Sequence, residues 1–220
     1  MISKKYYFDL QIHTTRYSPC SKLPPEKLID QAYRRKLHGF VITEHDHCWS
    51  EEEIAALKAE SKHGKDMVVL AGCEVRTSFD NRFTGDLLLF GVPGPPESPC
   101  TIGQACRYAR EHGGLAIAPH PYAKGQGIGD EVYRAHIAAL EVRNNRYPHD
   151  FPMEGRSQKA WEGLDLAGVA SSDAHSLDEV GMACTVFPGP VRNMEDLLHM
   201  IRKRSCKPRF RPAPFRWWPF

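Results

Sequence analysis

The residues of this chain that could do chemistry are mostly histidines and carboxylates placed at the ends of short apolar stretches. Four such stretches end in a potential metal ligand: Phe40 to His45, Val68 to Glu74, Leu115 to His120 and Gly168 to Asp173. Imidazole and carboxylate groups are common ligands of transition metals in proteins. We therefore expect these stretches to converge on a metal centre.

A fifth stretch, Phe8 to Thr14, supplies two more polar side chains. Leu10 and Ile12 alternate with Asp9, Gln11 and His13, so a β-strand here places its polar and apolar side chains on opposite faces. Polar groups that face inward need partners. The ends of the other four stretches can provide them.

The elements that position these residues alternate between strand-like and helix-like patterns. The sequence predicts strands at 8–14, 40–43, 67–74, 87–92, 115–118, 138–142, 166–171 and 183–187, with a polar turn over Arg76–Gly85. It predicts helices at 24–37, 50–64, 101–112 and 155–163, one capped by Asp130, and one from Asn193 to about Arg202. This order implies parallel strands joined by crossover helices.

Both a closed barrel and an open doubly wound sheet fit this alternation. In the fifth strand Ala116, Ala118 and His120 share one face and Leu115 and Ile117 the other. Small residues toward a crowded axis favour the barrel. Ligands at the ends of several strands then place the site at the carboxyl rim.

Length and composition predict one domain over residues 1–205, followed by a tail at 206–220. The 220 residues fit a single α/β barrel. The longest apolar runs are strand-sized, so we expect no membrane span. The first residues lack the apolar stretch of a signal peptide, and seven scattered cysteines include no C-x-x-C pair. We therefore expect a cytoplasmic protein with reduced thiols.

The charges are unevenly distributed along the chain. Seven of the 29 Lys and Arg residues follow Asp196, and no acid does. The remainder carries 22 bases against 27 acids, a charge of −5. An acidic body suits a cation site, whereas the overall charge does not indicate nucleic-acid binding.

Five motifs, DLQIHT, ITEHD, AGCEV, APHPY and SSDAH, occur in this order between Asp9 and His175. Together they resemble the PHP (polymerase and histidinol phosphatase) family. The resemblance implies a distorted seven-stranded (β/α)7 barrel that holds up to three divalent metals and hydrolyses phosphoesters. It further implies these ligands: His13 and Asp173 at a first site, Glu74 as a bridge, His120 at a second site, and His45 and His175 at a third.

The chain departs from the family pattern at three places. Gln11 stands where the family has histidine in D-L-H-x-H, and its amide can coordinate a hard cation or hydrogen-bond His13. A further third-site ligand is expected near Ser18, Pro19 and Cys20, although we expect Cys20 and Cys48 to be structural or idle. Asp86 occupies the place of a second-site histidine, and we predict that it substitutes for it.

These ligands predict a metal-dependent hydrolase that uses one to three zinc, manganese or iron ions. Two cations that share a carboxylate can lower the pKa of bound water to near 7. Glu74, Asp173 and His175 are the candidate catalytic residues. We expect cleavage of phosphate from a small phosphorylated metabolite or nucleotide; the alternative is a metal-depleted PHP domain that serves as a binding or scaffold module.

Several polar residues lie just beyond predicted strand ends. Arg16, Lys124 and Arg143 are candidate phosphate contacts. Glu141 and Asn144 could equally hydrogen-bond other loops or contact substrate. Oligonucleotide ends are among the substrates that the resemblance allows.

The tail is rich in proline, arginine and aromatic residues. Its prolines exclude a helix or a central strand. One interpretation is an extended strap that buries Phe215, Trp217 and Trp218 in grooves of the barrel. Another is a docking segment for a partner or a second subunit, because aromatic residues and Arg dominate interface hot spots. Contact with single-stranded nucleic acid is a third.

Overall fold

The protein, represented by a computed structural model, is described over residues 4–146 and 151–210, with only the backbone described at 151–154. The predicted strap or docking residues Phe215, Trp217 and Trp218 lie outside the described residues. Within these ranges, no helix has both the length and the apolar character needed to cross a lipid bilayer.

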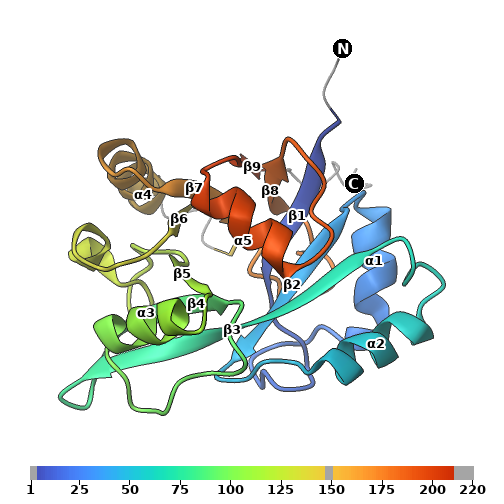
Figure 1. The fold of residues 1–220 in the computed structure, drawn as a ribbon, viewed down its shortest axis with the longest axis horizontal. Helices are drawn as coiled ribbons and strands as arrows, with labels where there is room; N and C mark the ends of the chain where they lie inside the picture. Colours follow the sequence, from blue (N-terminus) through green and yellow to red (C-terminus); the bar gives the residue numbers. More distant parts are fainter. Residues whose placement is uncertain (1–3, 147–150, 211–220) are drawn as a thin grey trace, which may run out of the picture.

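The described strands form one sheet in the order β7-β6-β5-β4-β3-β2-β1-β8-β9 (Figure 1). Their bounds are β1 (Tyr6–Ile12), β2 (Gly39–His45), β3 (Val68–Phe79), β4 (Arg82–Phe90), β5 (Leu115–Ala118), β6 (Ala139–Asn144), β7 (Ala167–Ser171), β8 (Ala183–Phe187) and β9 (Lys207–Phe210). The first residues of the predicted tail thus form an edge strand. Its Pro208 is tolerated there because an edge strand has one unpaired side.

The sheet curls until its two sides nearly meet, which confirms the predicted distorted α/β barrel. Ile12 forms an isolated parallel bridge with Ala174, just beyond β7. Between β7 and β8, Thr185 Oγ1 accepts from Ala170 N at 3.0 Å and donates to Ala170 O at 2.8 Å. A buried side chain therefore replaces backbone pairing at this point.

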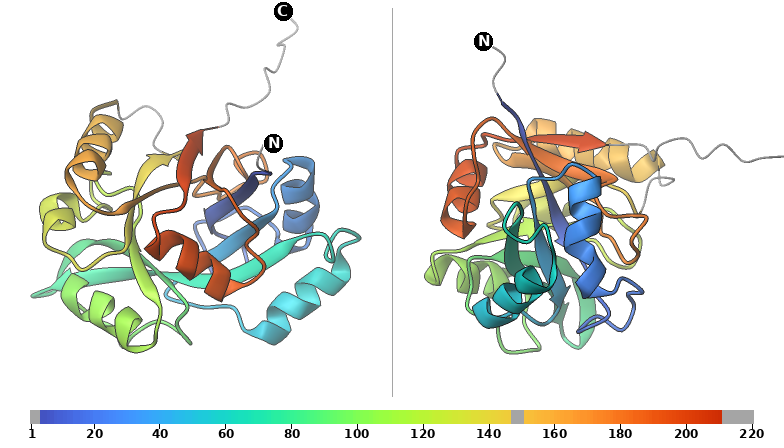
Figure 2. Two further views of the ribbon diagram at one scale, coloured as in Figure 1. Left: turned by 45° about the horizontal axis from the view of Figure 1, so that its top comes forward. Right: turned by 90° about the vertical axis from the view of Figure 1, so that its right-hand side faces the viewer.

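Helices cover the outside of the sheet. They are α1 (Leu28–Arg34), preceded by the 3-10 turn η1 (Pro25–Lys27), α2 (Glu51–Glu60), α3 (Ile102–Glu111), the 3-10 turn η2 (Gly129–Tyr133), α4 (Phe151–Gly163) and α5 (Met194–Arg202). In Figure 2, α1 and α2 lie on one side and α3 and α4 on the other. α5 packs against the interior cluster of the barrel through Leu197, Leu198 and Ile201.

Local sequence signals set several helix starts. Ser50 forms a capping box with Glu53, and Thr101 forms one with Gln104. Asn193 caps α5 by accepting from the backbone of the first turn. The predicted helix after Asp130 is wrong, because that segment is a single 3-10 turn without a side-chain cap.

The expectation of parallel strands throughout is wrong for β4, which runs antiparallel to both β3 and β5, and for β8, which runs antiparallel to β1 and β9. The predicted polar turn over Arg76–Gly85 is mostly strand, and the chain reverses at Asp80 and Asn81. Both have positive φ, 50° and 55°, as tight hairpin turns require. Arg76 consequently pairs with Asp86. The reversed direction brings the first half of β4 to the rim where the parallel strands end.

The expected faces of β5 are also reversed. Ala116 and Ala118 pack with α3, whereas Leu115 and Ile117 pack with the other strands inside the barrel. The alternation does not extend to His120, whose φ of 28° lies in the left-handed region. His120 therefore reaches the interior although Ala118 does not.

A register shift in β1 between Asp9 and Ile12 breaks the expected single polar face. Leu10 packs inside the barrel, but Ile12 packs with α1 outside it. Such bulges re-aim the side chains that follow them. Gln11 and His13 reach the interior end of the barrel, while Asp9 accepts hydrogen bonds from segments that follow β7.

We predict that Thr185→Val destabilises the barrel by about 2 kcal/mol, because the buried N–H and C=O of Ala170 lose their partner while the side-chain shape is kept. For a chain of this size this lowers the melting temperature by roughly 4–8 °C. Thr185→Ser is the matched control, since it retains the hydroxyl. Equal melting temperatures for the two variants would remove Thr185 from barrel closure.

Candidate metal centre

Glu74, at the rim end of β3's pairing with β2, is the point at which the other site residues meet. Its Oε2 lies 3.1 Å from His13 Nε2 and 3.3 Å from His45 Nδ1. Its Oε1 lies 3.1 Å from His120 Nε2 and accepts from Gln11 Nε2 at 3.1 Å. The Glu74 carboxylate thus presents one oxygen to each of two neighbouring sets of ligands, as a bridging carboxylate does.

Among the described residues, two groups have ligand atoms within 4.8 Å of one another: His13, His45 and His175 form one, and Glu74, Asp86 and His120 form the other. Asp173 lies close to both groups. Its carboxylate oxygens are 3.4 Å from His13 Nε2, 3.6 Å from His175 Nδ1 and 4.0 Å from His120 Nε2. The structure therefore brings together all eight side chains predicted from the sequence as metal ligands.

Two buried acceptor atoms in this cluster have no hydrogen-bond partner, Gln11 Oε1 and Asp86 Oδ1. Such atoms are costly unless something satisfies them. A divalent cation would, and a mixed set of imidazole and carboxylate donors suits zinc, manganese or iron. Gln11 hydrogen-bonds Glu74 rather than His13, and rotation of its amide would present the oxygen to the same region.

The ionisation of the centre is strongly coupled. Burial alone would raise the pKa of Glu74, but its contacts with His120 and His13 hold that pKa well below its ordinary value. Burial would likewise lower the pKa values of the two histidines, yet Asp173 and Glu74 raise the pKa of His13 to about 10, and Glu74 raises that of His120 to about 9. The Glu74 and Asp173 carboxylates therefore stabilise positive charge between them.

The remaining ligands respond differently. Burial, followed by repulsion from Glu74, raises the pKa of Asp86 to about 7. Burial lowers the pKa of His45 and that of His175, so both imidazoles offer a free lone pair near neutral pH. A lone pair is what a metal ligand needs.

Backbone strain accompanies two of the ligands. His120 and Asp173 have φ values of 28° and 52°, which are uncommon for residues with a side chain and concentrate at functional sites. Glu141 supports the first, because its Oε2 accepts from His120 N at 2.7 Å and from Asn144 Nδ2 at 2.8 Å. Glu141 and Asn144 therefore hydrogen-bond the neighbouring loop, and burial raises the pKa of Glu141 to about 8.

Ser18 and Glu44 orient His13. This role was not predicted from the sequence for either residue. Ser18 Oγ lies 3.2 Å from His13 Nδ1 and donates to Glu44 Oε2 at 2.5 Å. Ser18 must then accept from His13 Nδ1–H, so Nε2 is the ring nitrogen that faces Glu74. Glu44 is fully buried and also accepts from Thr14 and Trp49. Its only sequence signal was its place before His45.

The three predicted phosphate contacts lie at the surface. Arg16 pairs with Glu53 at 3.2 Å and stacks over the Trp49 ring, and Lys124 and Arg143 are exposed. None of the three is in either ligand group. The predicted free thiols are present at all seven cysteines, and Cys20 is exposed.

Two arginines that were not predicted from the sequence as site residues lie near the candidate ligands. Arg76 Nε is 3.7 Å from Asp86 Oδ1. Arg146 lies close enough to His175 for its charge to add to the lowering of that pKa, after the larger effects of burial and His13. Recognition of the β3–β4 hairpin would have pointed to Arg76, because it pairs across from Asp86.

Comparison with known sequences gives two matches. Residues 155–206 match a family model described as PHP-associated. An uncharacterized protein of Methanocaldococcus jannaschii is 29% identical over 147 residues, which cover 62% of this chain and 80% of that protein.

Solved structures share the fold at low sequence identity. PsfC of Pseudomonas syringae superposes with a TM-score of 0.65 at 17% identity over 94% of this chain and 92% of PsfC. A protein of Bifidobacterium adolescentis assigned as a metal-dependent phosphoesterase gives 0.59 at 13% identity, covering 90% and 96%. The lesion-specific endonuclease EndoQ of Pyrococcus furiosus gives 0.61 at 16% identity over 91% of this chain, which spans 56% of the endonuclease.

We predict that Ser18→Ala lowers the affinity for Mn²⁺ or Zn²⁺ by about 10- to 100-fold, the usual effect of removing a group that orients a ligating histidine. Ser157→Ala, at a buried serine in α4, is the matched control and should bind metal as wild type does. Titration with a competing chelator measures both. Equal affinities in the two variants would show that Ser18 does not orient His13.

We further predict that metal binding releases protons at pH 7. Before a cation binds, His13 and His120 are protonated at this pH, because their pKa values are about 10 and 9, and coordination requires their lone pairs. Apparent affinity should therefore rise with pH up to about 9, by about tenfold per unit for each proton released. Calorimetry in two buffers of different ionisation enthalpy counts the protons, and a count of zero contradicts this assignment.

Proposed function

We propose that this chain, which carries a PHP domain, is a divalent-metal-dependent hydrolase that cleaves phosphoesters of a small phosphorylated molecule or a nucleotide. The observation that carries the proposal is the position of Glu74. Its buried carboxylate lies between two groups of ligand atoms, with contacts of 3.1 Å on both sides. A scaffold module has no need of this arrangement.

The ligand assignments follow from the two groups and from Asp173 between them. His13, His45 and His175 would hold one cation and Asp86 and His120 another, with Glu74 and Asp173 contributing to both. Cations held in this way polarise a phosphoryl oxygen and lower the pKa of bound water. We assign Glu74, Asp173 and His175 to the catalytic centre. His175 can serve as a neutral ligand because burial lowers its pKa.

Guanidinium groups at the rim would bind the substrate phosphate. Arg76 lies beside Asp86, and Arg146 is close enough to His175 for its charge to act on that imidazole. Arginine binds phosphate through charge-assisted hydrogen bonds and stabilises charge on the nonbridging oxygens. Arg16, Lys124 and Arg143 remain candidates for more distant parts of the substrate.

The comparisons support a hydrolase without defining its substrate. The Bifidobacterium protein is assigned as a metal-dependent phosphoesterase and the Pyrococcus protein is an endonuclease, so small phosphoesters and nucleic acid are both compatible with this fold. The scaffold alternative has one observation in its favour. Gln11 donates to Glu74 at a position where the family has a histidine ligand.

We predict that Glu74→Gln lowers both bound metal and phosphoesterase activity by at least 100-fold, since it removes the negative charge and one coordinating oxygen from the centre. The assay is a panel of phosphomonoesters and phosphodiesters with Mn²⁺, Zn²⁺ and Fe²⁺, and elemental analysis measures the metal. Glu51→Gln, at an exposed residue of α2, is a control for the chemical change. Folded wild-type protein without turnover under any of these conditions would favour the scaffold.

A further inference from the structure

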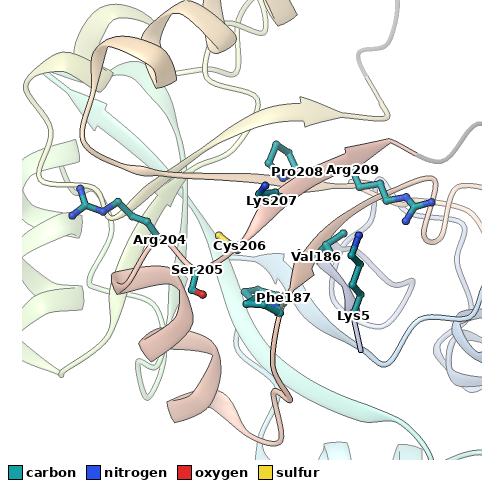
Figure 3. Close-up of a pocket in the computed structure, with 10 residues that line it drawn as sticks. Lys5, Val186, Phe187, Arg204, Ser205, Cys206, Lys207, Pro208 and Arg209 are labelled. Carbon is teal, nitrogen blue, oxygen red and sulfur yellow. The ribbon is translucent and has the colours of Figure 1, made fainter. Parts of the chain in front are cut away.

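A hollow lies at the opposite end of the barrel from the candidate metal centre, and Figure 3 shows the residues that line it. Its volume is about 570 Å³, which is within the 300–1,000 Å³ range of small-molecule sites. Lys5 precedes β1 here, Val186 and Phe187 end β8, and Lys207 to Arg209 belong to β9. The seven residues of β1 separate this hollow from Gln11 and His13 by about 20 Å at roughly 3.3 Å per residue.

The lining is cationic. Its ten residues include four bases, Lys5, Arg204, Lys207 and Arg209, and no acid. Arg204 extends away in Figure 3 and pairs with Asp165. Lys5 and Lys207 form no ion pair within the described part of the chain, and both are exposed. Three positive charges therefore remain at the hollow.

Two of these bases are held by the sheet. Lys207 and Arg209 are alternate residues of β9, so their side chains leave the strand on the same face, and β9 is fixed by antiparallel pairing to β8. The Arg209 guanidinium donates to the Tyr7 hydroxyl at 2.9 Å and lies 5.2 Å from the Tyr7 ring centroid. These contacts position the group without neutralising its charge.

The lining also includes apolar residues. Val186 and Pro188 are among them. We propose that this hollow is a second binding site, for a small ligand that carries a phosphate or diphosphate group on a planar or apolar body. The phosphate would meet Lys5, Lys207 and Arg209, and the body would pack against Val186 and Pro188. A multiply charged group suits a lining with three cations and no acid, and the volume suits a small molecule.

This site requires neither the metal centre nor the proposed hydrolase. Its test is calorimetric titration of the full chain with ADP and with inorganic pyrophosphate, in EDTA so that divalent cations contribute nothing. We expect ADP to bind more tightly than pyrophosphate, because only ADP fills the apolar part, and we expect both affinities to fall as salt rises. Absence of binding of either probe at millimolar concentration would overturn the proposal.

Variants locate the binding. The double substitution Lys207→Glu and Arg209→Glu should weaken ADP binding by at least tenfold, whereas Lys62→Glu, at an exposed lysine beyond α2, should not. Both should melt at the wild-type temperature, since the changed side chains are exposed. Glu74→Gln should bind ADP as wild type does. The site is overturned if Glu74→Gln changes ADP binding, if the double variant binds normally, or if a single-stranded oligonucleotide competes for the same residues more tightly than ADP.

Discussion

The arrangement of side chains at the carboxyl rim of this barrel depends on how the buried charge of Glu74 is compensated. An isolated carboxylate in the protein interior is strongly unfavourable, and this one is only 2% exposed. Its partners are three histidines and one amide: His13 just after β1, His45 at the end of β2, His120 after β5, and Gln11 in β1. Whether protons or metal ions supply the compensating positive charge, the fold has to deliver these groups to one point. The raised pKa values of His13 and His120 have the same cause, because a proton on each imidazole supplies positive charge beside Glu74 when no cation is bound.

Two irregularities of the sheet make this convergence geometrically possible. The bulge in β1 turns Gln11 and His13 toward Glu74, although Leu10 just before them already faces the interior. The reversed direction of β4 brings Asp86 to the same rim, because the first half of an antiparallel strand lies beside the last half of its neighbour. Left-handed backbone at His120 and Asp173 completes the arrangement. Each departure from regular geometry occurs next to a candidate ligand, where the stabilisation gained from polar contacts can offset the strain.

The barrel was predicted from the alternation of strand-like and helix-like patterns, and the candidate ligands from residue types at strand ends together with the PHP resemblance. Both inferences tolerate small errors in strand direction or face. Asp86 was assigned to the centre although β4 was thought parallel, because it occupies the place of the second-site histidine in the PHP motif pattern. The faces of β5 were predicted incorrectly, since alternation fails where His120 adopts positive φ. The orienting roles of Ser18 and Glu44 were not predicted, because hydrogen bonds between distant loops leave no periodic signal in the sequence. Arg76 was not predicted because the Asp80-Asn81 turn, which aligns Arg76 with Asp86, lies within a polar stretch that was predicted to be one long turn.

The most direct test of this account is an anomalous-scattering map from crystals of the full chain grown with Mn²⁺. The account predicts two adjacent peaks that share Glu74 as a ligand, one contacted by His13 and its neighbouring histidines and the other by Asp86 and His120. Metal bound without Glu74, or no ordered metal among these residues at saturating Mn²⁺, would contradict it.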